Sequence, residues 1–224
     1  MSQLQTLDRG IQALKFIARS RRGITVVEVA AHLQVHRAIA HRIIATLEAN
    51  TLITRNAGGD IFIGSGVMEL ASHFQPQFIA LCQPIINQVA LGSAATSFIS
   101  IASGDECVVI LVAEPENTMF RVGYKVGSRH PISQGAAGIA ILAGRAESSA
   151  DSQLVLQARA DGYCVTRGAL QSGAVGLAFP IAIADHSKPS LEACIGVVAM
   201  NDLDIEKSLA IVRTAAGKIA EQLH

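Results

Sequence analysis

The sequence is poor in aromatic and charged residues. Aromatic residues make up 4% of the 224 residues, with no tryptophan and two tyrosines, and charged residues make up 16%. Half of the residues are hydrophobic, so the chain can bury a sizeable core in one or two domains. Because the formal net charge is zero at pH 7, any preference for a charged partner must come from how the charges are distributed along the chain.

No aspartate, glutamate, lysine or arginine occurs between Glu69 and Asp105, which makes a membrane span worth testing. A span needs about 20 consecutive, mostly apolar residues. The stretch is interrupted by Gln75, Pro76, Gln77, Gln83, Pro84, Asn87 and Gln88. We therefore expect no membrane association, and because no basic segment precedes an apolar one at the start, we expect no secretion signal.

The four cysteines are widely separated, at Cys82, Cys107, Cys164 and Cys194. They form no C-x-x-C pair and no close pair with a histidine, which argues against the common zinc and redox motifs. The histidines between residues 32 and 41 are joined by no thiol or carboxylate that completes a metal set. We expect buried or free thiols in a reducing cytoplasm, with no metal and no cofactor.

Residues 25–63 carry the pattern of a winged helix-turn-helix. Apolar residues recur at helical spacing over 26–33 and again over 39–47, with a short break between. Thr25 and Glu28 match a capping box, which places the start of the first helix at about Thr25. Two β-like runs follow on either side of a Gly-Gly turn over 56–60. This order predicts a DNA-binding module.

The second helix of this pair is the predicted recognition helix. Its outward face combines small residues with cations, which lets the backbone approach the base edges of a major groove. The residues predicted to contact DNA from this helix are His36, Arg37, Ala38, His41 and Arg42. The hairpin is the predicted wing, in which Arg55 and backbone N–H groups would contact phosphate or the minor groove.

An interaction module that never touches nucleic acid would show the same helices and hairpin. The distribution of charge favours DNA binding over that alternative. Residues 1–64 hold eight lysines and arginines against four acids, a net charge of +4, whereas residues 65–224 carry a net charge of −4. A basic head on an acidic body is typical of a protein that binds a polyanion at one end.

An apolar stripe precedes the DNA-binding helices at Leu7, Ile11, Leu14 and Ala18. Its spacing fits a helix with an approximately heptad pattern. Two roles fit the stripe. It either packs behind the helix pair, or it associates with a second copy and so pairs two DNA-binding units across a two-fold axis.

From residue 77 the pattern changes to mixed helices and strands, which predicts an α+β fold with an antiparallel sheet flanked by helices. We expect three segments: a winged helix-turn-helix domain over 1–64, a linker helix over 65–76 and the α+β domain over 77–224. The expected strands of that domain cover residues 96–102, 107–114, 119–124, 163–166, 176–184 and 193–200. A loop over 127–144 is expected to run into a helix of small residues, and further helices to cover 78–91, 152–160 and the C-terminal segment.

Two bends rich in glycine and alanine, at residues 135–138 and 173–176, suit a ligand cavity between sheet and loop. Simple turn chemistry would also account for them. We favour the cavity, because two such bends in one small domain indicate that something approaches the backbone closely.

Several segments occur together in an order typical of one protein family. In the first half they are L-D-R-G-I-Q-A-L-K-F-I-A from Leu7, T-V-V-E-V-A-A-H-L-Q-V-H-R-A-I-A-H-R from Thr25, and the wing exit D-I-F-I-G. In the second half they are V-G-S-R-H-P-I-S-Q-G-A-A-G-I-A from Val126, D-G-Y-C-V-T from Asp161 and G-A-V-G-L-A-F-P-I from Gly173. The Val126 segment is similar to the family pattern G-x-x-x-P-L-H-A-T-A-x-G-K-A. Together the segments resemble the IclR family of bacterial transcriptional regulators.

The resemblance implies a winged helix-turn-helix joined to a GAF-like effector-binding domain. It implies double-stranded operator DNA as a partner, a homodimer formed through the N-terminal domain, and pairing of dimers into a homotetramer. It also implies a cavity for a small metabolite, commonly an organic or aromatic acid. Carried over by position, the effector-binding residues are Ser133, Ala136, Ala137, Thr166, Gly176, Gly196 and Val198. Family members often place more polar side chains at five of these positions, so we expect a roomier cavity that suits an aromatic molecule with one polar end.

Two other interpretations stay open. The second domain could be an enzyme that uses Cys107, Cys164 or Cys194, although a nucleophilic thiol needs an activating base and neither His130 nor His186 has a cysteine at a recognisable spacing. It could also serve only oligomerisation and carry a vestigial cavity. We expect a cytoplasmic regulator that is not an enzyme.

Overall fold

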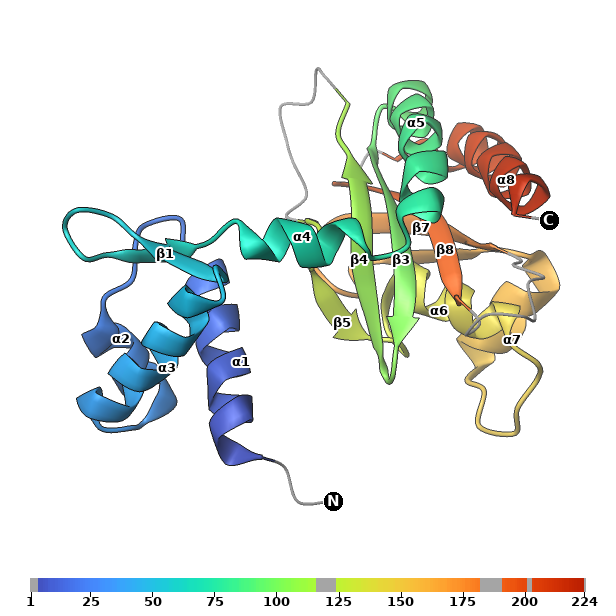
Figure 1. Ribbon diagram of the computed structural model, residues 1–224. Helices are drawn as coiled ribbons and strands as arrows, with labels where there is room; N and C mark the ends of the chain where they lie inside the picture. The colour runs from blue at the N-terminus through green and yellow to red at the C-terminus, as the bar shows by residue number, and fades with distance from the viewer. Residues whose placement is uncertain (1–3, 116–123, 182–190, 201–202, 224) are drawn as a thin grey trace. The chain divides into compact units, whose positions relative to one another are not determined.

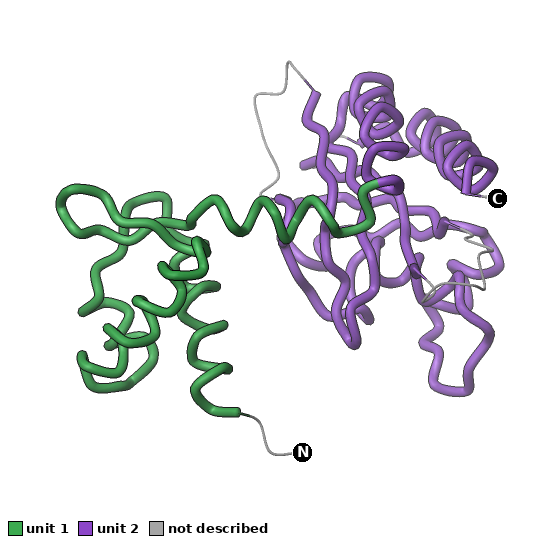
Figure 2. The backbone as a smooth tube through the Cα atoms, in the orientation of Figure 1, with its two compact units in different colours: residues 1–76 green, residues 77–224 purple. Residues whose placement is uncertain are grey.

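The computed structural model describes residues 4–115, 124–181, 191–200 and 203–223 (Figure 1). The chain divides into two compact units, residues 1–76 and 77–224, which are coloured separately in Figure 2. In the described part of the chain, no helix is both long enough and apolar enough to cross a membrane.

The first unit consists of three packed helices, a two-stranded hairpin and a short helix. Its elements are α1 (Gln5–Ala18), α2 (Val26–Leu33), α3 (Arg37–Ala49), β1 (Ile53–Arg55), β2 (Ile61–Ile63) and α4 (Gly66–Ser72). The two strands are antiparallel, with Thr54 opposite Phe62. This is the predicted order of a winged helix-turn-helix.

Helix α2 begins at the predicted capping box. The backbone N–H of Thr25 donates to Glu28 Oε2 at 2.8 Å, and the backbone N–H of Glu28 donates to Thr25 Oγ1 at 3.2 Å. The backbone N–H and then the hydroxyl of Thr25 hold the pKa of the Glu28 carboxyl below its usual value. At the other end Gln34 adopts a left-handed conformation, with φ of 53°, which ends the helix and turns the chain toward α3.

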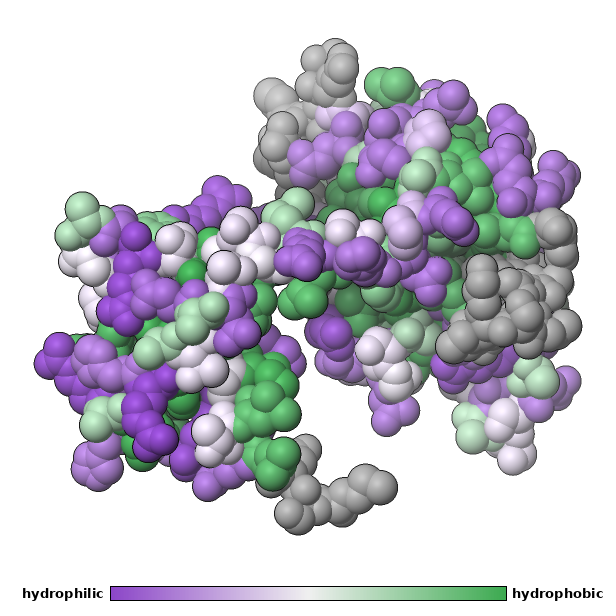
Figure 3. All heavy atoms as spheres, viewed as in Figure 1, coloured by the Kyte–Doolittle hydropathy of each residue, from purple (hydrophilic) through white to green (hydrophobic). Residues whose placement is uncertain are grey.

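Helix α1 has two apolar faces with different surroundings. Ala13 and Ile17 are buried in the core that α1 shares with α2, α3 and the hairpin. Leu7 and Ile11 lie on another face and are 61% and 45% exposed, and Leu14 between the faces is half-buried. Figure 3 shows this hydrophobic surface along α1. The core therefore leaves most of the predicted stripe free for another contact.

The second unit is built on a six-stranded antiparallel sheet with the strand order β5-β4-β3-β8-β7-β6. Its strands are β3 (Thr96–Ser103), β4 (Glu106–Ala113), β5 (Arg129–Pro131), β6 (Cys164–Arg167), β7 (Ala174–Ile181) and β8 (Ala193–Met200). Its helices are α5 (Pro76–Ser93), α6 (Gly135–Gly144), α7 (Gln153–Asp161) and α8 (Ile205–Gln222).

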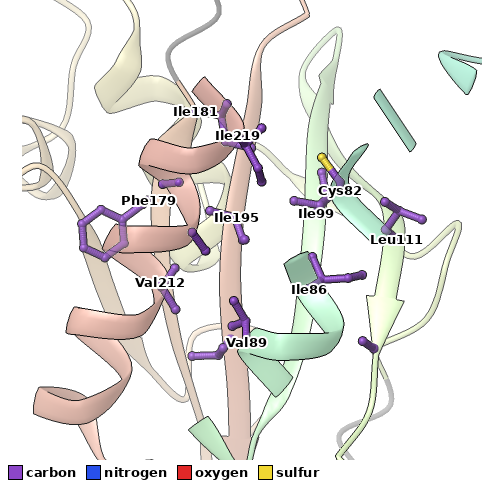
Figure 4. Packing of buried hydrophobic residues seen from close by; sticks show 14 of the residues in the cluster. Cys82, Ile86, Val89, Ile99, Leu111, Phe179, Ile181, Ile195, Val212 and Ile219 are labelled. Atoms are coloured by element: carbon purple, nitrogen blue, oxygen red, sulfur yellow. The ribbon is translucent and has the colours of Figure 1, made fainter. Parts of the chain in front are cut away.

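Helices cover both faces of this sheet. On one face Ile86 of α5 and Val212 of α8 pack against strand residues such as Ile195 (Figure 4). On the other face Ile139 of α6 and Val155 of α7 belong to a second cluster of buried residues. The predicted α+β fold, with an antiparallel sheet flanked by helices, is confirmed.

The main difference from the predicted elements lies in the segment over 127–144. A short strand, β5, occurs where the sequence predicts only a loop, because three residues ending in a proline are too few to show an alternating pattern. It pairs with β4 and sets His130 opposite Cys107. The predicted strand over 119–124 lies outside the described residues except at Tyr124, and the strand predicted over 176–184 is described as far as Ile181.

Candidate functional site

Helix α3 has one buried face and one face open to solvent. Ala40, Ile43 and Ile44 are buried. The predicted DNA-contacting residues of this helix, His36, Arg37, Ala38, His41 and Arg42, are all exposed. At about 3.6 residues per turn, Ala38 and Arg42 lie roughly opposite the buried face. The structure thus brings small and cationic side chains together on one accessible surface.

The hairpin is tied to α3 by an ion pair. Arg55 Nε lies 3.1 Å from Glu48 Oε2, and the Arg55 side chain keeps 29% of its surface exposed. A guanidinium has five N–H donors, so Arg55 can keep Glu48 and still donate to another acceptor. In the turn, Asn56 Nδ2 donates to Asp60 Oδ2 at 3.0 Å, and the backbone N–H of Asp60 donates to Asn56 Oδ1 at 2.9 Å.

A mostly apolar groove of about 700 Å³ runs between α1 and α3. Leu7, Ile11 and Leu14 line it from α1, and Ile39 and Arg42 line it from α3. Arg42 therefore borders both the outward face of the predicted recognition helix and this groove. The sequence pattern of α3 alone does not predict that second neighbour.

The second unit contains a cavity of about 260 Å³. Its walls come from the sheet, from the first turn of α6 and from the loop that joins β6 to β7. Five of the seven predicted effector-binding residues line it: Ala136, Ala137, Thr166, Gly176 and Val198. Phe98 of β3 adds an aromatic wall that the sequence analysis did not predict.

The lining of this cavity does not include the other two predicted residues, Ser133 and Gly196, whose role stays a prediction. Ser133 is exposed in the turn before α6. A Cβ at Gly196 would lie 2.4 Å from the carbonyl oxygen of Leu177 and 2.5 Å from Phe98 Cζ. Gly196 therefore allows the backbone of Leu177 and the ring of Phe98 to approach closely.

The cavity also has a polar wall that the sequence analysis missed. Tyr124 Oη lies 3.2 Å from His130 Nε2, and His130 Nδ1 lies 3.0 Å from the carbonyl oxygen of Pro131. Burial, with a smaller effect of the Cys107 thiol, raises the pKa of the Tyr124 hydroxyl well above its usual value, so the hydroxyl keeps its proton. No spacing rule links Tyr124 to His130; the pairing of β5 with β4 holds His130 in place.

Helix α6 begins at the cavity wall. Gly135, Ala136 and Ala137 line the cavity, and the N-cap residue Gln134 forms no side-chain capping bond in the described structure. Backbone N–H groups in the first turn of a helix lack intrahelical partners and favour an acceptor or an anion. Gly135 has a φ of +71°, which a glycine adopts without strain.

The cysteines are poorly placed for nucleophilic chemistry. All four are free and buried, and burial raises the pKa of Cys82 to about 12 and that of Cys107 and Cys164 to about 11. The register sets Cys107 opposite His130, yet both ring nitrogens of His130 have other partners. A thiolate, which the enzyme interpretation requires, is strongly disfavoured at these sites.

His186 lies outside the described residues. Among the residues that the structure does describe, no three His, Cys, Asp or Glu side chains are grouped so that they could hold a metal ion.

Comparison with known proteins identifies the first unit. The model of the IclR helix-turn-helix domain matches residues 6–57, which include α1, α2, α3 and the first strand of the hairpin. This match assigns the first unit to the IclR type of helix-turn-helix domain. The fold of the chain agrees with this, because the IclR transcriptional regulator of Alicyclobacillus acidocaldarius superposes with a TM-score of 0.82 at 20% identity, over 100% of both chains.

The chain is also similar to curated repressors. It is 28% identical to the HTH-type transcriptional repressor AllR of Salmonella paratyphi A over 141 residues, which cover 62% of this chain and 52% of AllR. It is 24% identical to the acetate operon repressor of Salmonella typhimurium over 157 residues, which cover 68% and 57% of the two chains. The chain spans about half the length of the curated relatives it matches.

A further IclR structure was solved with a ligand. The IclR homolog of Microbacterium hydrocarbonoxydans, in complex with 4-hydroxybenzoate, has a TM-score of 0.83 to this chain at 18% identity, over 97% of this chain and 98% of that one. At this identity the likeness concerns the fold.

Proposed function

We propose that this protein is a transcriptional regulator that binds operator DNA through its first unit and a small organic effector through its second. The observation that carries the proposal is the exposed face of α3, where His36, Arg37, Ala38, His41 and Arg42 stand together within the segment that matches the IclR helix-turn-helix. The printed names of the curated relatives, both repressors, support it. The site of action would be the bacterial cytoplasm, where the DNA is.

The proposed active form is a homodimer, with pairing of dimers into tetramers as the larger assembly. The exposed stripe on α1 and the apolar groove beside it support this assembly, because a monomer would leave Leu7 and Ile11 in water. A two-fold axis between the first units would present two recognition helices to two half-sites of an operator.

The proposed effector is a small aromatic acid. A cavity of about 260 Å³ with Phe98 and Val198 in its wall suits a single-ring molecule better than a keto acid of two or three carbons, which would leave apolar surface wet. The open N–H groups at the start of α6 would receive the carboxylate. The 4-hydroxybenzoate bound by the Microbacterium hydrocarbonoxydans homolog is a compound of this class.

Two measurements test the proposal. Footprinting on the DNA beside the protein's own gene is expected to show a protected site, with random DNA bound at least about a thousandfold more weakly. A thermal-shift screen is expected to show a higher melting temperature with benzoate-like acids than with pyruvate or glyoxylate, because a ligand of the folded state stabilises it. Equal binding of all DNA sequences would contradict the regulator. If no acid raises the melting temperature, the second unit serves oligomerisation alone.

A further inference from the structure

The hydrogen-bond directions in the Tyr124–His130 pair follow from the partners. The carbonyl oxygen of Pro131 can only accept, so the 3.0 Å contact with His130 Nδ1 requires a hydrogen on Nδ1. In a neutral imidazole the other nitrogen, Nε2, is then an acceptor. The hydroxyl of Tyr124, 3.2 Å from Nε2, must therefore donate its hydrogen to His130.

This arrangement leaves Tyr124 Oη with only lone pairs to offer the cavity. A tyrosine hydroxyl has one hydrogen, and His130 takes it. The buried hydroxyl of Ser100 also faces Tyr124 Oη and can donate to one of its two lone pairs, which leaves the other for the cavity. The nearby thiols supply no charge, because burial raises the pKa of Cys107 to about 11 and that of Cys194 well above its usual value. Arg129, beside His130, pairs with Glu106 at 2.6 Å. The pair therefore forms an acceptor site in a cavity whose other polar groups include the N–H donors of α6.

We propose that Tyr124, oriented by His130, accepts a hydrogen bond from a hydroxyl group of the effector, so that the cavity selects hydroxylated aromatic acids over their unhydroxylated analogues. The inference rests on the proposed function of the cavity as an effector site. An aromatic ring without a hydroxyl would bury the cavity-facing lone pair of Tyr124 Oη without a partner, which is unfavourable. A carboxylate at the same point would set two acceptors against each other. The carboxylate is thereby directed to α6 and the hydroxyl to Tyr124.

Calorimetry with benzoate and its 2-, 3- and 4-hydroxy derivatives tests this selection on the 224-residue protein. In the wild type, at least one hydroxybenzoate is expected to bind about tenfold more tightly than benzoate. In Tyr124→Phe the difference is expected to shrink to within about twofold, while benzoate itself binds at least as tightly as in the wild type, because the variant has no hydroxyl lone pair to bury. Retained benzoate binding also shows that the variant cavity is intact.

The matched control is Tyr163→Phe, which removes the hydroxyl of the chain's other tyrosine. Tyr163 stacks on Phe179 with ring centroids 5.4 Å apart and does not line the cavity. This variant is expected to keep the wild-type preference.

Three results would overturn the inference. Equal binding of benzoate and all hydroxybenzoates by the wild type, or an undiminished preference in Tyr124→Phe, would overturn it and leave the effector site standing. Binding of none of these acids would overturn both the selection and the aromatic effector.

Discussion

At the scale of single residues, two glycines of the second unit show how differently an absent side chain is used. A Cβ at Gly176 would lie 3.4 Å from Ala136 Cβ and 3.6 Å from Thr166 Oγ1, which is ordinary contact at the edge of open space. At Gly196 the same atom would overlap Phe98 and the backbone of Leu177. The two positions look alike in the sequence, but one leaves room for a ligand and the other for a neighbouring ring.

Gly176→Leu is expected to abolish effector binding because the added side chain fills the cavity. Gly176→Ala is the control and is expected to bind the effector nearly as the wild type does. Calorimetry with the best hydroxybenzoate measures the affinity, and fluorescence anisotropy with operator DNA is expected to show no change in either variant. An unchanged effector affinity in Gly176→Leu would rule out this cavity as the binding site.

Arg42→Ala is expected to weaken binding to operator and random DNA alike, since an arginine on the outward face of α3 can hold a phosphate. The slope of log affinity against log salt should fall by about one unit for the lost contact. His41→Ala is expected instead to change the preferred operator sequence. Lys218→Ala, which removes a cation from the second unit, is the control. If both α3 variants bind DNA as the wild type does, α3 is not the recognition helix.

At the scale of elements, α1 is a helix that serves two surfaces. Its inner face completes the core of the first unit with Ala13 and Ile17, and its outer face carries the exposed stripe beside the groove. The heptad pattern in the sequence could not separate these roles, because both faces are apolar. The exposed fractions do separate them, and they favour a contact made by the outer face.

Leu7→Glu is therefore expected to dissociate the dimer. An unpaired charge buried in an apolar interface costs several kcal/mol, and at a side chain that is 61% exposed in the single chain the substitution should leave the fold intact. Gln5→Glu adds the same charge at an exposed position two residues earlier and is expected to keep the dimer. Sedimentation velocity measures both. An unchanged sedimentation coefficient for Leu7→Glu would remove α1 from the interface.

The strands and helices that bury the four thiols make stability depend on pH in the alkaline range. Folding raises the thiol pKa to about 11 for Cys107 and Cys164 and about 12 for Cys82, above the value of about 8.5 in an unfolded chain. The unfolded state then loses protons first. The contribution of these buried thiols to the free energy of unfolding is therefore complete below about pH 8.5 and is lost as the pH rises through about 11.

Alkylation checks the same burial directly. At pH 8 the native protein is expected to react with iodoacetamide only as fast as it unfolds, whereas the protein in denaturant takes up four equivalents by mass spectrometry. Rapid labelling of any one cysteine in the native protein would contradict the burial of that thiol.

At the scale of the whole molecule, the sequence predicted what depends on local pattern. The capping box of Thr25 and Glu28 fixes the start of α2 within a few residues, and helical spacing identifies the buried face of α3. The cavity depends instead on pairing between distant strands. Tyr124 and His130 come together only because β5 adds to the edge of the sheet beside β4. The space beside Gly196 is occupied only because Phe98 lies opposite it on the adjacent strand.

The ion pair between Arg55 and Glu48 bears on the entropy of binding. A free arginine on a wing loses side-chain rotamer freedom when it settles on a phosphate, and that loss opposes binding. Here Glu48 already restricts the guanidinium, at 3.1 Å, before any DNA is present. The Arg55 side chain would therefore already be ordered when the wing contacts the phosphate backbone. Part of its conformational entropy is lost on folding, and less remains to be lost on binding DNA.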